Sequence, residues 1–158
     1  MDHLWSPWRF HYVSQAAKPT GCIFCQKPQA EKDEENLIFY RGKYNFGILN
    51  LYPYTSGHLM IVPYRHAAAL NEAAPEALSE LMELTRRAEL ALTQVYRPRG
   101  INVGVNIGEC AGAGIAGHIH MHVLPRWPGD VNFMTAIGET RVLAEEIATT
   151  YAKLKEAF

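Results

Sequence analysis

The stretch GHIHMHVLPRW, residues 117–127, alternates imidazole and apolar side chains. The three histidines are His118, His120 and His122, and the residues between them are Ile119, Met121 and Val123. A period of two is that of a β-strand, whose successive side chains point to opposite faces, whereas a helix would scatter the three rings. The pattern predicts a strand over residues 118–124, with the histidines on one face and the apolar residues in the core.

The length of this predicted strand limits what the row of histidines can bind. At about 3.3 Å per residue, His118 and His122 are about 13 Å apart along a strand. All three rings therefore cannot bind one metal ion at about 2.1 Å, and the row suits an extended substrate better. Two other interpretations stay open. One is a set of surface histidines on a half-buried strand, and the other is a zinc-dependent hydrolase in which His118 and His120 are ligands.

Turn signals and hydrophobic periodicity divide the rest of the chain into strands and helices. The glycine turn at Gly42-Lys43 indicates a hairpin, and Pro75 stands where a long helix would begin. The predicted strands are Leu37–Arg41, Tyr44–Leu49, His58–Tyr64, Ile101–Ile107 and His118–Leu124. The predicted helices are a long one, which starts at Asn71 or at the Ala73-Ala74-Pro75 corner and ends at the breakers Pro98 and Gly100, and a C-terminal one at Val142–Leu154. This order predicts an α+β fold with a mostly antiparallel five-stranded sheet.

The long helix should pack on this sheet through an apolar stripe. Residues three and four apart along it share one face. The stripe predicted from this spacing is Leu78, Leu81, Met82, Thr85, Ala88, Leu92 and Val95.

Length and composition favour a single soluble domain. The 158 residues suffice for one domain with a hydrophobic core, and we expect 1–158 to form it. Residues 1–36 are predicted to be an irregular leader, rich in aromatic residues, that packs on this domain. The formal net charge of −1 argues against a general nucleic-acid or anionic-membrane surface. No apolar run approaches the length of a membrane span.

Cysteine usage and the N-terminus predict a cytoplasmic location. The chain has three cysteines, Cys22, Cys25 and Cys110, and an odd number does not indicate a disulfide framework. The N-terminus lacks the continuous apolar region of a signal peptide.

The spacing of Cys22 and Cys25 is CxxC, which is typical of metal or redox sites. A closed zinc site needs two further ligands. A pair of free buried thiols is the alternative interpretation. A thioredoxin-like redox site is disfavoured because no βαβ pattern surrounds the motif. Cys110 is interpreted as a bystander.

The segment Gly112–Gly117 matches the letters of a dinucleotide-binding fingerprint, G-x-G-x-x-G. That fingerprint must follow a strand and open a helix. Here it leads into a β-patterned segment, so we reject the Rossmann interpretation. Small residues still allow backbone N–H groups to cradle a phosphate, although an ordinary flexible loop would look the same.

Several segments together resemble one known family. The histidine row, as His-φ-His-φ-His-φ-φ, resembles the motif of the histidine-triad (HIT) family. Further segments resemble that family and its diadenosine-tetraphosphate phosphorylase/hydrolase-like branch, over about residues 4 to 135. They are Leu4–Arg9, Asn50–Pro53, Gly57–Pro63, Asn106–Gly114 and Pro125–Phe133.

This resemblance implies nucleotidyl transfer at an α-phosphate. His120 would be the nucleophile that forms a covalent nucleotidyl-histidine, because a neutral imidazole offers one bare nitrogen and needs no metal. His122 would support the leaving oxygen, and His58 would complete the hydrogen-bond network. Residues expected to contact substrate are Asn50 at the ribose, Asn106, Ala113 and Gly114 at the phosphates, and Trp127 at the base. Gly114 departs from the family, whose residue there often carries a hydroxyl or amide, and Trp127 is as readily explained by packing.

The resemblance also implies a structural zinc and a homodimer. Relatives that carry CxxC bind zinc through two cysteines, a histidine at the position of His66, and the first histidine of the row. In this chain the set is Cys22, Cys25, His66 and His118. HIT proteins are usually homodimers with sheets joined across the interface.

Other functions also remain open from the sequence. They are a nucleoside phosphoramidase or AMP-ester hydrolase, the zinc-dependent hydrolase named above, and a nucleotide-binding regulatory protein with an inactive site.

Overall fold

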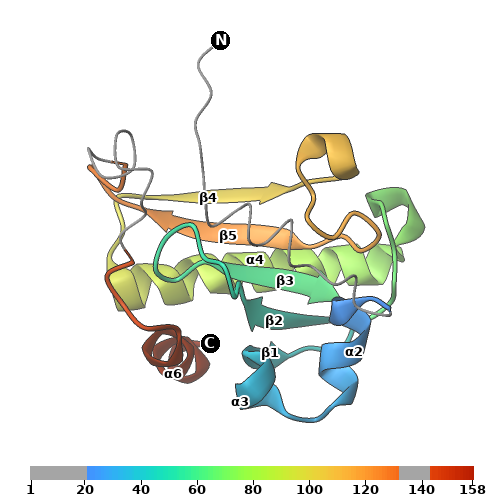
Figure 1. Ribbon diagram of the computed structural model, residues 1–158, viewed down its shortest axis with the longest axis horizontal. Helices are drawn as coiled ribbons and strands as arrows, with labels where there is room; N and C mark the ends of the chain where they lie inside the picture. The colour runs from blue at the N-terminus through green and yellow to red at the C-terminus, as the bar shows by residue number, and fades with distance from the viewer. Residues whose placement is uncertain (1–20, 132–142) are drawn as a thin grey trace.

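The computed structural model describes residues 21–131 and 143–158 and contains one five-stranded antiparallel sheet. Its strand order is β1-β2-β3-β5-β4, which Figure 1 shows from the bottom of the sheet to the top. The strands are β1 (Ile38–Arg41), β2 (Asn45–Leu49), β3 (Leu59–Pro63), β4 (Gly100–Val105) and β5 (Met121–Arg126). The predicted α+β class and five-stranded sheet are confirmed.

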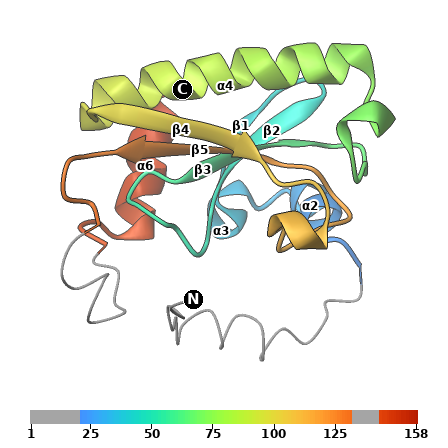
Figure 2. The same cartoon turned by 90° about the horizontal axis from the view of Figure 1, so that it is seen from above.

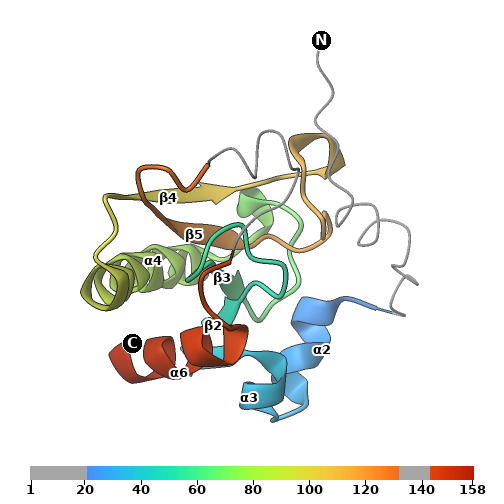
Figure 3. The same ribbon diagram turned by 60° about the vertical axis from the view of Figure 1, so that its left-hand side comes forward.

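Helices cover both faces of this sheet. They are α2 (Ile23–Gln29), α3 (Asp33–Asn36), α4 (Pro75–Tyr96) and α6 (Ile147–Ala157), with short 3₁₀ turns at η1 (Leu70–Glu72) and η2 (Glu109–Ala111). Figure 2 shows α4 along one face and α2 and α3 on the other. Figure 3 shows α6 on the side of the molecule opposite to β4. In the described part of the chain, no helix has the length and apolar character needed to cross a membrane.

Strand alternation creates two separate cores. Residues Leu59, Ile61 and Val123 face α4 and α6. Residues Met60 and Val62 face the other way, toward α2. Because all of β3 is buried, both of its faces are apolar, and the sheet can support a site on the α2 side without losing the core beneath α4.

The histidine strand begins later than the alternation predicted. Hydrogen-bonded pairing starts at Met121, so His118 and His120 lie before β5. The backbone N–H of Ile119 donates to the carbonyl of Ala67 at 2.8 Å, outside the sheet ladder. His118, Ile119 and His120 are all buried, and the Phe24 ring lies near both histidine rings, so these two rings share one side of the segment.

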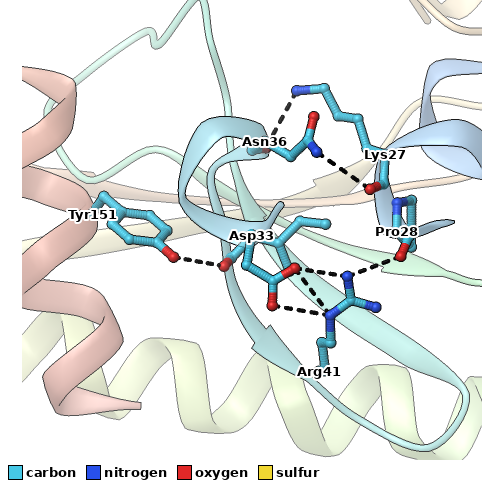
Figure 4. A network of polar contacts seen from close by, with 7 residues as sticks. Lys27, Pro28, Asp33, Asn36, Arg41 and Tyr151 are labelled. Atoms are coloured by element: carbon cyan, nitrogen blue, oxygen red, sulfur yellow. Dashed lines mark hydrogen bonds and ion pairs between the residues drawn. The ribbon is translucent and has the colours of Figure 1, made fainter. Parts of the chain in front are cut away.

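The leader was predicted to be irregular, and this is wrong for residues 21–36, which form α2 and α3. A charged network ties these helices to β1 (Figure 4). Arg41 forms an ion pair with Asp33 at 2.7 Å and donates to the carbonyl of Pro28 at 2.9 Å. Tyr151 of α6 donates to the carbonyl of Ile38 at 3.0 Å. The leader's first 20 residues lie outside the described part of the chain.

Helix α4 begins at Pro75, in the second of the two predicted places and not at Asn71, and ends where Arg97 adopts a left-handed conformation. Its buried face is rotated from the predicted stripe, and Met82 is 56% exposed. The buried set is Ala77, Leu81, Leu84, Thr85, Ala88, Ala91 and Leu92. Small alanines allow the helix to approach the sheet closely, so the larger Met82 and the predicted Leu78 and Val95 are left toward the margins.

Glu80 of α4 holds the β1–β2 hairpin by one carboxylate. It accepts the backbone N–H groups of Lys43, Tyr44 and Asn45 at 2.7–2.8 Å, and the Asn45 side-chain amide at 2.8 Å. Burial alone would raise the pKa of Glu80, but these hydrogen bonds outweigh it and lower the pKa.

We predict that Glu80→Ala lowers the free energy of unfolding by about 1–3 kcal/mol, because it leaves backbone donors without their acceptor. Urea denaturation measures the change. The matched control is Glu83→Ala on the same helix, where the carboxylate pairs with the exposed Arg86 and a loss below about 1 kcal/mol is expected. Equal losses in the two variants would contradict the role assigned to Glu80.

Candidate active site

His120 is 5% exposed and is held by a single backbone contact. Its Nδ1 lies 2.9 Å from the carbonyl oxygen of His118. Because a carbonyl can only accept, Nδ1 carries the proton, and in the neutral ring Nε2 keeps its lone pair. Burial lowers the pKa of His120 although this hydrogen bond opposes the shift, so the ring is neutral at pH 7. The geometry presents a basic ring nitrogen that is ready to act as a nucleophile.

His58 and His122 form a second, linked hydrogen-bond chain. The backbone N–H of Tyr54 donates to His58 Nδ1 at 3.1 Å. His58 therefore carries its proton on Nε2, which lies 2.9 Å from His122 Nδ1 and donates to it. The neutral His122 ring must then carry its own proton on Nε2. The chain ends in a donor, and the His122 and His120 ring centroids are 4.7 Å apart. The neighbouring rings thus carry a lone pair on His120 Nε2 and an N–H on His122 Nε2.

Two aromatic residues that the sequence analysis missed hold these rings. The Tyr54 ring stacks on His58 with centroids 5.0 Å apart and an interplanar angle of 24°. The Phe24 ring lies 5.0 Å from His120 and 5.6 Å from His118. Tyr54 lies in a turn-forming segment, and Phe24 lies between the two cysteines of the CxxC motif. Neither residue therefore has a local sequence signal that connects it to the histidine row.

The predicted ribose residue, Asn50, lies beside His58. Its backbone N–H donates to the carbonyl of His58 at 3.1 Å, and its Oδ1 accepts the N–H of Tyr52 at 2.9 Å. Its Nδ2 lies 3.4 Å from His58 Nε2. The structure therefore brings Asn50 next to the two linked histidines, His58 and His122.

The residues predicted to bind the phosphates lie on the side of His120 away from Asn50. The last pair of the β4–β5 ladder is Val105 with Met121, so Asn106 and His120 are the next residues beyond this pair on their two segments. Asn106 donates to the carbonyl of Gly112 at 3.5 Å, which is long for a hydrogen bond. Ala113 and Gly114 follow in the glycine loop, which enters β5 rather than a helix. This context agrees with the rejection of a Rossmann site.

Trp127 stands just beyond β5, at the far end from the glycine loop. Its ring meets the Tyr96 ring edge-on with centroids 6.3 Å apart, and its backbone N–H donates to the Asp130 carboxylate at 3.3 Å. The packing interpretation thus has a definite contact, while the ring remains partly exposed. Cys110 is exposed on η2, away from the other cysteines.

The four predicted metal ligands come together in space. The ligand atoms of Cys22, Cys25, His66 and His118 all lie within 4.8 Å of one another. The Cys22 and Cys25 sulfurs are 3.3 Å and 3.6 Å from His118 Nδ1, and Cys25 is 3.4 Å from His66 Nδ1.

This set fits a tetrahedral zinc. Bonds of about 2.3 Å to sulfur and about 2.0 Å to nitrogen separate neighbouring ligand atoms by roughly 3.4–3.8 Å. His118 Nε2 donates to the carbonyl of Pro63 at 2.8 Å, so Nδ1 carries the lone pair that faces the two sulfurs. A backbone acceptor of this kind is the usual partner of a metal-bound imidazole.

The comparisons with known proteins agree with this arrangement. The HIT domain family matches residues 31–129. An AP-4-A phosphorylase of Mycobacterium tuberculosis is 41% identical over 157 residues, which cover 95% of this chain and 80% of that protein. A bis(5'-nucleosyl)-tetraphosphatase [asymmetrical] of Schizosaccharomyces pombe is 30% identical over 93 residues, 59% of this chain and 50% of that one.

Solved structures share the fold. A Zn-bound histidine triad family protein from Mycobacterium smegmatis superposes with a TM-score of 0.71 at 25% identity, covering 87% of this chain and 92% of that one. A histidine triad nucleotide-binding protein from Sulfolobus tokodaii gives 0.70 at 27% identity, covering 86% and 91%. The fold and the site define a histidine-triad enzyme. The chain belongs to the HIT family.

The protonation of His122 predicts how stability depends on pH. Burial, with a smaller contribution from His120, lowers the pKa of His122 to about 4. An unfolded histidine has a pKa of about 6.5, so between these values the unfolded chain binds more protons and acidification favours unfolding.

We therefore expect the melting temperature to fall as the pH is lowered from 7 to 4, with a shallower fall in His122→Gln than in the wild type. Differential scanning calorimetry across this range measures both slopes. Identical pH slopes for the two proteins would show that His122 is not the linked group.

Proposed function

We propose that this enzyme cleaves dinucleoside polyphosphates at an α-phosphate through a covalent nucleotidyl intermediate on His120. The observation that carries the proposal is the orientation of His120, whose Nδ1–H is held by the His118 carbonyl so that Nε2 is the nucleophilic nitrogen. The phosphorylase and tetraphosphatase names of the relatives support the substrate class.

The first step forms a bond between His120 Nε2 and the α-phosphorus. The anhydride bond to the bridging oxygen breaks, and the nucleoside polyphosphate leaves with that electron pair. His122 carries its Nε2 proton because His58 fills its Nδ1, so it can donate a hydrogen bond to the leaving oxygen. Asn50 is placed to bind the ribose, and Asn106, Ala113 and Gly114 to bind the phosphates. Trp127 is proposed to stack on a base.

The second step returns the nucleotidyl group to an acceptor. We propose inorganic phosphate as this acceptor, which would give ADP from an adenylyl intermediate and restore the neutral His120. Support comes from the relative at 41% identity, which is named a phosphorylase. Water in the same position would give AMP.

Zinc is proposed to be structural. Bound by Cys22, Cys25, His66 and His118, it would join α2 to the segment before β5 and supply rigidity there. The zinc-hydrolase alternative uses His118 and His120 together. It finds less support because, among the described residues, the metal-capable cluster includes His118 and not His120.

We also propose a cytoplasmic homodimer. The thiols of Cys22, Cys25 and Cys110 are all free, which suits a reducing compartment. Strand β4 is at the sheet edge and is largely exposed, which supports pairing of sheets between two copies. The domain is proposed to comprise residues 1–158.

His120→Ala should abolish turnover, with a loss of about 10³-fold or more, because the covalent nucleophile is removed. Mass spectrometry of the His118–Arg126 segment after rapid quenching should find an added AMP in the wild type and none in the variant. Turnover at the wild-type rate in a folded His120→Ala protein would refute the mechanism. Absence of the adduct and of turnover in the wild type would favour a regulatory nucleotide-binding protein.

The acceptor and the substrate class are tested with diadenosine tetraphosphate and an AMP-amine conjugate, each with and without phosphate. Phosphate-dependent formation of ADP from the tetraphosphate is expected. AMP as the product in the presence of phosphate would contradict phosphorolysis, and a strong preference for the conjugate would favour the phosphoramidase alternative.

Removal of one metal ligand should release zinc and destabilise the fold. We predict about one zinc per chain in the wild type and in the control Cys110→Ser, and far less in Cys25→Ser, with a lower melting temperature. Elemental analysis and calorimetry measure the two effects. The fraction of Cys25→Ser that stays folded should still form the His120 adduct. Full zinc content in this variant would contradict the assigned ligand set.

A further inference from the structure

The edge strand β4 presents an open surface next to the histidine row. Cross-strand partners in an antiparallel pair point to the same face, and Gly104 pairs with His122 while Asn102 pairs with Leu124. A side-chain contact agrees with this register, because Arg126 of β5 donates to Asn102 Oδ1 at 2.7 Å. Asn102, Gly104 and Asn106 therefore lie on the catalytic side of the sheet, and we refer to these three residues as the β4 face.

The β4 face is empty at its centre. Among the described residues, no atom lies within 4 Å of the position that a Cβ on Gly104 would occupy. Gly104 and Asn102 are exposed, whereas the opposite flank of His120 is closed by the Phe24 ring. Glycine here is not explained by the backbone, because its φ lies outside the left-handed region and any residue would be sterically accepted.

Polar groups mark the two ends of the β4 face. Asn106 lies at one end, one residue beyond the Val105–Met121 pair that closes the ladder next to His120. At the other end, Arg126 occupies Asn102 Oδ1, which leaves the NH₂ group of Asn102 as a hydrogen-bond donor. The Arg126 guanidinium also forms an ion pair with Asp130 at 2.5 Å, so it brings no net charge to this end. Four residues of strand span about 13 Å, enough for several phosphate groups in a row.

We propose that the β4 face is the binding site for the leaving nucleoside polyphosphate. This inference rests on the proposed function, in which His122 donates to the leaving oxygen. Since Gly104 is the cross-strand partner of His122, the chain that follows that oxygen passes over Gly104. The phosphates run from Asn106 toward the NH₂ group of Asn102. The absence of a side chain at Gly104 then leaves room for a long leaving group.

The test inserts a side chain into this path. In Gly104→Val, the added methyl groups meet open space, so the melting temperature should stay close to that of the wild type. With diadenosine tetraphosphate, KM should rise by about tenfold or more, since the phosphate chain is displaced from its contacts. With an AMP aryl ester, whose small leaving group does not reach along β4, kcat/KM should remain within about twofold. Gly104→Ala should give a smaller change in the same direction.

A matched control adds bulk on the other face of the same strand. Val103 is 48% exposed and points away from the catalytic side. Val103→Ile should therefore leave the kinetic constants for both substrates unchanged. Unchanged tetraphosphate kinetics in a folded Gly104→Val protein would overturn the proposal, as would equal losses on both substrates. Both results differ from failure of the proposed function, in which the wild type itself would not cleave the tetraphosphate or form the His120 adduct.

Discussion

The hydrogen bond from His120 Nδ1 to the carbonyl of His118 is the contact on which the rest of the site depends. It fixes which nitrogen of a buried, neutral imidazole keeps its lone pair, and it does so within three residues of one extended segment. The carbonyl belongs to a residue whose own side chain faces the two cysteines. The cluster that could hold a metal ion and the proposed nucleophile are therefore adjacent parts of one backbone.

The three histidines of the row differ in protonation because each ring has a different hydrogen-bond partner. His118 is held by the Pro63 carbonyl, His120 by a backbone carbonyl, and His122 by His58. Each partner selects one tautomer. His118 consequently directs an unprotonated nitrogen to the cysteine sulfurs. His120 keeps an unprotonated Nε2, and His122 carries an N–H beside it. Burial keeps all three neutral, since it lowers each pKa.

Several expectations from the sequence depended on local signals, and those agree with the structure. The hairpin at Gly42-Lys43 and the helix start at Pro75 follow from turn and capping chemistry that acts over a few residues. The stripe of α4 was misplaced because sequence spacing does not reveal which flank meets the sheet, and Met82 is exposed as a result. The predicted histidine strand starts too early because the alternation in the sequence also covers the residues before Met121, the first paired residue of β5. In that segment the backbone N–H of Ile119 donates to the carbonyl of Ala67. The CxxC segment was treated as irregular, although it enters helix α2, whose Phe24 is buried in one cluster with Ile38 of β1.

The sequence by itself determined the spacing of the histidines, the alternation that places them on one face, and the types of group available for nucleophilic and metal chemistry. These properties depend on neighbouring residues, whose geometry the backbone repeat controls. Only the tertiary structure decided that Cys22 and Cys25 would meet His66 and His118, that Tyr54 would orient His58, and that Gly104 would stand open beside His122. Those contacts join residues distant along the chain or depend on strand register, and register is set by the packing of both sheet faces rather than by any one segment.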